Sequence, residues 1–272
     1  MNNASDIILH DKRIMASLDI GDSCAYKCKY CLNGDCDFIP RFKTIAGAVS
    51  AIKSCKDEYF IISPGCEQDI FNNGEMAIKY LSQLARFGKI LAVATKSRLT
   101  DTTINQLASI DQKLKKSGVY LAVEISFASG RTRRDIEPYS PSIKDRVDTL
   151  KGLRQNGIIV IPFIRPILPQ QLVSDDELLS IVDITCEYAD VYAIGDFYYT
   201  EKIVRLLDLN DEAFDERENS TTIPSSPFWD DRKKWFKYES KHRKRILKEY
   251  IQSKNKAIYD SSSGAILHYL NG

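Results

Sequence analysis

Hydrophobic and polar positions alternate along residues 14–194 in two distinct ways. Short, nearly continuous apolar runs predict buried strands, whereas apolar positions three or four residues apart predict helices with one buried face. The apolar runs predict six strands, at 14–20, 58–63, 89–94, 119–127, 158–164 and 189–194. Helical spacing predicts five helices between them, at 44–54, 73–87, 101–116, 142–156 and 174–188. The last of these helices begins with Ser174 and has Glu177 three residues later, which predicts a capping box.

This alternation predicts an α/β fold, because strands that alternate with helices pair in parallel through right-handed crossovers. A partial (β/α)6 barrel over residues 1–200 is the natural arrangement, with a flavodoxin-like open sheet as the alternative. Residues 201–272 are expected to form a C-terminal α-rich extension. The chemistry of such barrels lies at the carboxyl ends of the strands, and polar residues follow several of the predicted strands.

Three cysteines follow the first predicted strand within eight residues: Cys24, Cys28 and Cys31. A tight loop with this spacing can direct three thiolates toward one metal cluster. Zinc usually takes four ligands as two separated pairs, and Cys36 could be a fourth, but no second pair or nearby His supports it. Three thiolates suit an iron–sulfur cluster with one iron left open. An iron–sulfur cluster is therefore the preferred interpretation, with zinc or structural thiols as the alternative.

The other cysteines and the overall composition set limits on the class of protein. Cys55 and Cys186 are expected to be small buried hydrophobic residues, and neither they nor Cys36 has an assigned role. The chain has 38 Lys and Arg against 37 Asp and Glu, which excludes binding of nucleic acid by bulk positive charge. No window approaches the roughly 18 consecutive apolar residues of a membrane span, and the N-terminus lacks a secretory signal. We therefore expect a cytoplasmic protein with no membrane partner and no disulfide framework.

The sequence Cys-Ala-Tyr-Lys-Cys-Lys-Tyr-Cys at 24–31 resembles the CxxxCxxC motif of the radical S-adenosylmethionine (SAM) superfamily, including the aromatic Tyr30 before the last cysteine. From about residue 14 to 169, the order of motifs is most similar to the spore photoproduct lyase branch. Residues 66–69 (Cys-Glu-Gln-Asp) resemble a Cys-Thr-Ser-Asp stretch of that family, although Glu and Gln replace Thr and Ser. Residues 135–142, with Glu137-Pro138 before a helix that contains Arg146, resemble another of its motifs. Beyond Thr200 no resemblance is found.

The resemblance implies an enzyme in which Cys24, Cys28 and Cys31 bind a single 4Fe–4S cluster. The reduced cluster cleaves SAM to methionine and a 5′-deoxyadenosyl radical, which abstracts hydrogen from a substrate. An electron donor such as flavodoxin or ferredoxin is implied as a partner. The residues expected to bind SAM are Tyr30, Gly65, Glu67, Lys96, Ser126 and Arg165.

Two further residues are expected to face the substrate, Cys66 as a hydrogen donor and Glu124 as an acid or base. The resemblance implies the role of Cys66, whereas Glu124 is a charge within an apolar strand, which is costly unless it is paired. Structural alternatives remain open for several of these residues. Gly65 would belong to an ordinary Pro-Gly turn, Lys96 would be solvated, Arg165 would form an ion pair and Cys66 would be a buried thiol.

The C-terminal region hides a strong charge asymmetry. Residues 201–231 hold three basic and nine acidic residues, whereas residues 232–256 hold eleven basic and two acidic residues. The basic segment from Arg232 to Lys256 also contains aromatic residues and a predicted helix at 241–253, whereas 221–227 is expected to be a loop or linker. It could bind phosphates and stack on bases, or it could pack on the barrel with its charges solvated. The substrate is therefore expected to be a nucleic acid or nucleotide. The alternatives are a peptide or small metabolite, or a non-catalytic protein that binds zinc or an iron–sulfur cluster.

Overall fold

A computed structural model of the chain describes residues 8–10, 15–20, 24–32, 42–65, 68–210, 213–214, 219–223 and 235–270. The chain divides into two compact units. The first unit comprises Met1–Ala25, Ile39–Ile125 and Asp148–Val160, and the second comprises Tyr26–Phe38, Ser126–Val147 and Ile161–Gly272.

The first unit contains a sheet with the strand order β1 (Ile8–His10), β2 (Met15–Leu18), β3 (Ile61–Pro64), β4 (Ile90–Thr95) and β5 (Leu121–Phe127, of which the last two residues belong to the second unit). β1 runs antiparallel to β2, and β2 to β5 are parallel. Every residue of β2 and β3 is buried. The unbroken apolar runs in the sequence therefore correspond to strands covered on both faces.

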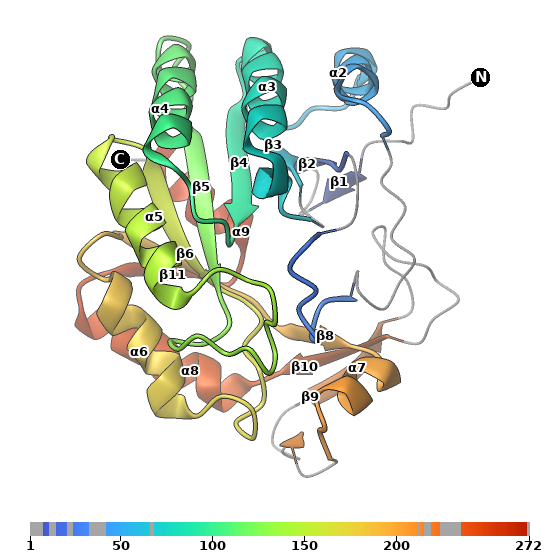
Figure 1. Cartoon of the computed structure of the whole chain (residues 1–272), viewed down its shortest axis with the longest axis vertical. Helices are drawn as coiled ribbons and strands as arrows, with labels where there is room; N and C mark the ends of the chain where they lie inside the picture. The colour runs from blue at the N-terminus through green and yellow to red at the C-terminus, as the bar shows by residue number, and fades with distance from the viewer. Residues whose placement is uncertain are drawn as a thin grey trace. The chain divides into compact units, whose positions relative to one another are not determined.

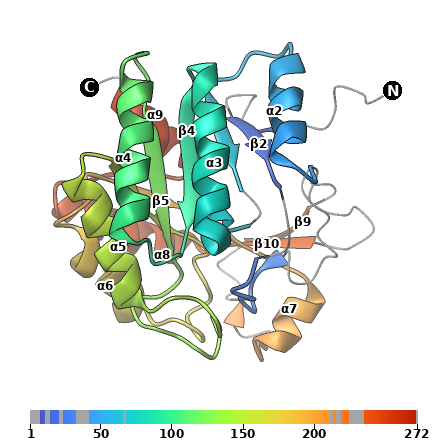
Figure 2. The same cartoon turned by 45° about the horizontal axis from the view of Figure 1, so that its top comes forward.

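Three helices cover one face of these strands: α2 (Ile45–Ser54), α3 (Gly74–Leu84) and α4 (Asp101–Lys115) (Figures 1 and 2). Each begins at a residue whose side chain accepts a hydrogen bond from the backbone of the first turn, namely Thr44, Asn73 and Thr100. The short 3₁₀ segments η1 (Ile70–Asn73) and η2 (Ala85–Phe87) precede and follow α3. No helix among the described residues is long and apolar enough to cross a membrane.

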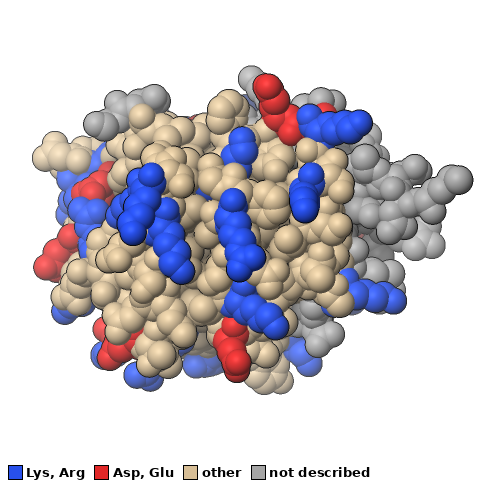
Figure 3. All heavy atoms as spheres, turned by 90° about the horizontal axis from the view of Figure 1, so that it is seen from above, with Lys and Arg blue, Asp and Glu red and all other residues tan. Residues whose placement is uncertain are grey.

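The C-terminal turns of α2 and α4 carry positive charge, with Lys53 in α2 and both Lys113 and Lys115 in α4. Lysines at these positions complement the helix dipole. Figure 3 shows the face at the top of Figure 1, and the arrow of β4 points away from this face. On this face, Lys and Arg predominate over Asp and Glu. Because α2 leads into β3 and α4 leads into β5, the lysines at the ends of these two helices lie near the amino ends of those strands.

The second unit contains parallel strands in the order β6 (Ile159–Ile164, which begins in the first unit), β7 (Val191–Ile194) and β11 (Ala257–Tyr259). A separate antiparallel sheet has the order β8 (Phe197–Tyr199), β10 (Trp235–Glu239) and β9 (Asn219–Ile223). The helical segments are α6 (Asp175–Thr185), α7 (Glu201–Leu206), α8 (Lys241–Ser253), α9 (Ser262–Leu267) and η4 (His268–Leu270). α5 (Ile143–Gln155) begins in this unit and ends in the first.

The predicted strands and helices of residues 14–194 are confirmed to within about three residues at each end. Among the described residues after 200, helices predominate, as expected, but β9, β10 and β11 also lie there. The predicted loop at 221–227 is wrong for residues 221–223, which belong to β9, and 224–227 lie outside the described residues. The capping box at α6 is half confirmed. Ser174 accepts from the Glu177 N–H at 3.2 Å, but the Glu177 carboxylate instead binds the hydroxyl of Ser129.

Candidate active site

In the first unit, the chain turns sharply after β3 at Gly65. This residue has φ +72°, and a Cβ at this position would lie 2.9 Å from the backbone oxygen of Gln68. Only glycine adopts this conformation without strain. The Gly65 N–H donates to the carbonyl of Leu18 at 3.1 Å, which fixes the turn beside the end of β2. The tight turn explains why position 65 is a glycine. The expected contact of Gly65 with SAM stays a prediction.

The carboxylate of Asp69 is the hub of this edge of the sheet. Its oxygens accept hydrogen bonds from the Thr95 hydroxyl at 2.8 and 2.9 Å, from the Ser97 hydroxyl at 3.1 Å and from the Lys96 N–H at 2.7 Å. The Phe71 N–H donates to the same carboxylate at 3.0 Å. Burial raises the pKa of Asp69, and these hydrogen bonds act in the opposite direction. Asp69 therefore ties the loop after β3 to the loop after β4.

Lys96, predicted to bind SAM, begins that second loop and is half-buried. Because its backbone N–H is held by Asp69, the direction in which its side chain leaves the strand is fixed. The Gln68 amide, one residue before Asp69, donates to the backbone carbonyl of Ile20. Three consecutive strand ends of the first unit are thus joined by buried polar contacts.

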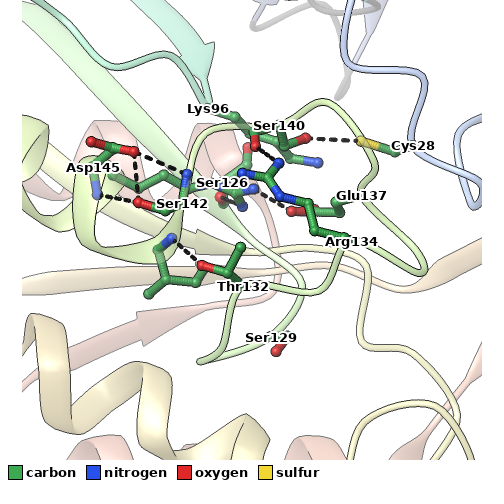
Figure 4. A network of polar contacts seen from close by, with 12 residues as sticks. Cys28, Lys96, Ser126, Ser129, Thr132, Arg134, Glu137, Ser140, Ser142 and Asp145 are labelled. Atoms are coloured by element: carbon green, nitrogen blue, oxygen red, sulfur yellow. Dashed lines mark hydrogen bonds and ion pairs between the residues drawn. The ribbon is translucent and has the colours of Figure 1, made fainter.

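In the second unit, residues 26–31 of the cysteine loop are anchored by backbone hydrogen bonds. Lys27 has a positive φ of 47°, and the Cys31 N–H donates to the Cys28 carbonyl at 3.0 Å, which closes a tight turn. The Lys29 N–H donates to the carbonyl of Ile136 at 2.9 Å. The thiol of Cys28 is buried and lies 3.5 Å from the Ser140 hydroxyl (Figure 4). The loop that joins β5 to α5 therefore supports this part of the cysteine loop.

A buried chain of charged and polar groups strengthens this support. The Tyr30 hydroxyl donates to one oxygen of Glu137, and the other oxygen pairs with Arg146. Arg146 also donates to the backbone carbonyl of Ser126 at 3.0 Å, and its side chain is only 1% exposed. Burial holds the pKa of Tyr30 well above its usual value, and the charges of Cys28 and Glu137 add to this, so the hydroxyl keeps its proton and donates.

The outer part of the β5–α5 loop is cross-linked as well. Arg134 donates to the backbone carbonyl of Ser140, and the Ser142 hydroxyl donates to Asp145 at 2.6 Å. The Ile143 N–H donates to the Thr132 hydroxyl at 2.9 Å (Figure 4). These contacts make the loop a rigid platform for Tyr30 and Cys28.

The remaining predicted residues are placed as follows. Ser126 is half-buried in β5, where its carbonyl accepts from Arg146, and Glu124 is buried two residues earlier, opposite Ala94 of β4. Arg165 is exposed directly after β6. Cys66, Glu67 and Cys36 lie outside the part of the chain that the structure describes.

Cys55 and Cys186 are not buried as expected. Each is the residue that follows the last turn of a helix, α2 for Cys55 and α6 for Cys186, and each is only half-buried. Helix ends lie at the surface of the fold, so a cysteine at such a position stays partly open to solvent.

The predicted cluster ligands Cys24, Cys28 and Cys31 form no disulfide within the described part of the chain. Within the described ranges, no group of three or more His, Cys, Asp or Glu side chains is arranged to hold a metal ion. The donor chemistry fits an iron–sulfur cluster, because three thiols in one loop are available as thiolates and none is consumed in a disulfide.

Most described charges of the basic C-terminal segment are paired within the protein. Arg243 is buried and bonds to Asp175 at 2.8 Å and to the Val173 carbonyl at 2.6 Å. Several lysines form ion pairs, among them Lys237 and Lys244 with Asp196, Lys248 with Asp260 and Lys254 with Asp183. Tyr238 is 2% exposed and cannot stack on a base. The described part of this segment, which excludes 232–234, packs within the second unit.

Comparison with known proteins identifies the fold. No family model matches the chain. An uncharacterized protein of Methanocaldococcus jannaschii, MJ0683, is 32% identical over 111 residues, which are 41% of this chain and 37% of that protein. The chain thus covers little more than a third of this curated relative.

Among solved structures, spore photoproduct lyase complexed with dinucleoside spore photoproduct aligns with a TM-score of 0.68 at 13% identity, over 94% of this chain and 79% of the lyase. Streptococcus suis SuiB bound to S-adenosylmethionine aligns with a TM-score of 0.58 at 11% identity, over 90% of this chain and 50% of SuiB. Both neighbours are radical SAM enzymes. At these identities the likeness concerns the fold, and it confirms the predicted radical SAM type of α/β fold.

Asp69, Glu137 and Arg146 were part of motifs in the sequence, but no role was predicted for any of them. The signal was present for each. Asp69 is a carboxylate just after an apolar strand. Glu137 and Arg146 are opposite charges, one before a turn and the other in the helix that follows it.

Proposed function

We propose that this chain is a radical SAM enzyme in which Cys24, Cys28 and Cys31 bind a 4Fe–4S cluster. The observation that carries the proposal is a CxxxCxxC loop after β2, whose three cysteines form no disulfide, in a chain with the radical SAM fold. The anchoring of Cys28 and Tyr30 on the β5–α5 loop supports it, because a loop that is already ordered loses less conformational freedom when it takes up a cluster. When bound, the reduced cluster supplies the electron that cleaves SAM to methionine and a 5′-deoxyadenosyl radical.

The chain's own residues bind and orient the reactants. Lys96 presents an ammonium group at the end of β4, where it can pair with the SAM carboxylate. Gly65, Glu67, Ser126 and Tyr30 complete the proposed SAM contacts. Cys66 is proposed as hydrogen donor to the product radical, since a thiol S–H is weak enough to quench a carbon radical, and Glu124 as an acid or base toward the substrate.

The substrate we propose is a nucleic acid or nucleotide. Support comes from the likeness to spore photoproduct lyase over 79% of its length, together with the motif order of the sequence. The basic C-terminal segment adds little support, because most of its described charges are paired internally. A peptide substrate is the second candidate, because another neighbour is SuiB bound to the precursor peptide SuiA, with a TM-score of 0.59 at 14% identity. A cytoplasmic electron donor such as flavodoxin or ferredoxin completes the proposal.

Formation of 5′-deoxyadenosine tests the enzymatic part of the proposal. Wild-type protein reconstituted anaerobically, then given dithionite and SAM, should release 5′-deoxyadenosine and methionine. Cys28→Ala should abolish this release, whereas Cys55→Ala, the matched control outside the motif, should retain it. Equal release by both variants, or none by the wild type, would refute the proposed chemistry.

A further inference from the structure

Arg165 occupies an unusual position directly after β6, at the carboxyl edge of the sheet. Its N–H donates to the carbonyl of Phe127 at 3.0 Å, so its backbone is fixed. Its guanidinium lies 5.6 Å from the ring centre of Phe163 and 5.8 Å from that of Tyr198. Arginine stacks on aromatic faces in this way and keeps the N–H donors at its edges free for other partners.

The stem of Arg165 is held by a close approach to Gly195, the residue that follows β7. A Cβ at position 195 would lie 2.8 Å from Cδ and 2.9 Å from Cγ of Arg165. Real Cβ atoms are almost never found so close, so any larger residue would push the arginine off its rings. Gly195 and the two rings therefore preorganise the guanidinium on the exposed side of the sheet edge.

The other well-placed arginines of the second unit have carboxylate partners. Arg133 pairs with Asp135 and Glu177, Arg146 with Glu137, and Arg243 with Asp175. No carboxylate pairs with Arg165 among residues 24–32, 68–210 and the other ranges that the structure describes. An oriented guanidinium without an acidic partner, at the edge of the sheet where substrates bind, has the donor geometry for an incoming oxyanion.

The charged groups beside Tyr198 leave an excess of one positive charge around Arg165. Lys237 of β10 pairs in register with Tyr198 of β8, so both side chains lie on one face of the small sheet. Lys237 and Lys244 share Asp196 and reach Glu239, so with Arg165 the group carries three positive and two negative charges. The ring of Tyr198 is half-buried and leaves part of its surface open for stacking.

We propose that Arg165 binds a phosphate of the substrate, with the guanidinium fork taking two of its oxygens and Tyr198 bordering the attached group. This assignment rests on the proposed function and replaces the expectation that Arg165 contacts SAM. Arg165 could bind an oxyanion from either of two ligands, a phosphate of the substrate or the carboxylate of SAM. A binding experiment distinguishes these two ligands.

Equilibrium binding of thymidine 5′-monophosphate and of thymidine is measured on the reconstituted full chain, alongside binding of SAM. The wild type should prefer the phosphorylated probe by about tenfold, the size expected of a charge-assisted bidentate contact. Arg165→Gln should remove most of this preference, and Arg165→Lys should remove part of it because lysine lacks the fork. Arg205→Gln, the same change at an exposed position of α7, should keep it.

Three results would overturn the assignment. The wild type could show no preference for the phosphate, both arginine variants at 165 could retain it, or Arg165→Gln could lose SAM affinity while the phosphate preference stays. The measurement needs no turnover. Absence of 5′-deoxyadenosine formation in the wild type would therefore refute the proposed function without affecting the outcome for Arg165.

Discussion

Substitution of Glu137 by Gln tests whether the buried Tyr30–Glu137–Arg146 chain supports the cysteine loop. The change keeps the shape of the side chain and leaves an oxygen for the Tyr30 hydroxyl, but it turns an NH₂ group toward Arg146. Arg146 is 1% exposed, and its charge would lose Glu137, its one carboxylate partner among the described residues. Leaving one member of a buried ion pair uncompensated costs about 3–5 kcal/mol. At about 2–4 °C per kcal/mol for a chain of this size, the melting temperature should fall by roughly 6–20 °C.

The assay is thermal unfolding of the protein without metal, followed by iron uptake during anaerobic reconstitution. Asp135→Asn is the matched control, because Asp135 lies two residues away in the same loop and pairs with Arg133 but is 57% exposed. An exposed pair contributes at most about 1 kcal/mol, so this variant should melt within a few degrees of the wild type. The double variant Glu137→Gln/Arg146→Met removes both charges and should be more stable than Glu137→Gln alone. A Glu137→Gln variant as stable as Asp135→Asn, with normal iron uptake, would refute the reasoning.

Three further predictions concern Asp69, Gly65 and Arg243. Burial raises the folded pKa of Asp69 above its unfolded value of about 3.9, so its contribution to stability is present below that pH and is lost as the pH rises through the folded pKa. Urea denaturation across pH measures the unfolding free energies of the wild type and of Asp69→Asn. Their difference should shift in favour of the variant as the pH rises. A shift in favour of the wild type would show that the four hydrogen-bond donors to Asp69 lower its pKa by more than burial raises it. Gly65→Ala should lower the urea midpoint more than Gly118→Ala, because both glycines have positive φ but a Cβ at 118 meets nothing within 4 Å, and equal losses would argue against a crowded turn. Arg243→Met should lower the free energy of unfolding by about 3 kcal/mol or more, because it leaves buried carbonyls without their donor. Arg245 forms an exposed pair with Glu249, so Arg245→Met should lower the free energy of unfolding by under about 0.5 kcal/mol. Similar midpoints for the two arginine variants would contradict the packing of α8 on the second unit.

The strands and helices that could be predicted from the sequence are those whose pattern is set locally. Long apolar runs such as that of β5 and helices with polar caps, such as Thr100 before α4, carry their own signals. β1 and β11 have three residues each and exist because a neighbouring strand offers them hydrogen bonds, which no local pattern records. β10 has a local signal, because Phe236 and Tyr238 alternate with Lys237 at the period of a strand. The lysines of the same segment also fit nucleic-acid binding, so its sequence does not favour a strand alone.

For the site, the cysteine motif and the strand-end positions of Lys96 and Arg165 were visible in the sequence. The partners that hold them were not, because Glu137 and Tyr30 are 107 residues apart and Asp69 and Lys96 are 27 apart, so only the folded chain brings them together. The meaning of the basic segment likewise depended on tertiary structure, since Asp196 and Asp183 lie far from the lysines they pair with.

Metal analysis after anaerobic reconstitution tests the central claim most directly. The wild type should hold about four iron and four sulfide per chain, the composition of one 4Fe–4S cluster. Cys24→Ala, Cys28→Ala and Cys31→Ala should each lose this iron, and Cys186→Ala should keep it. One zinc per chain with no iron, or full iron content in a variant of the motif, would contradict the account.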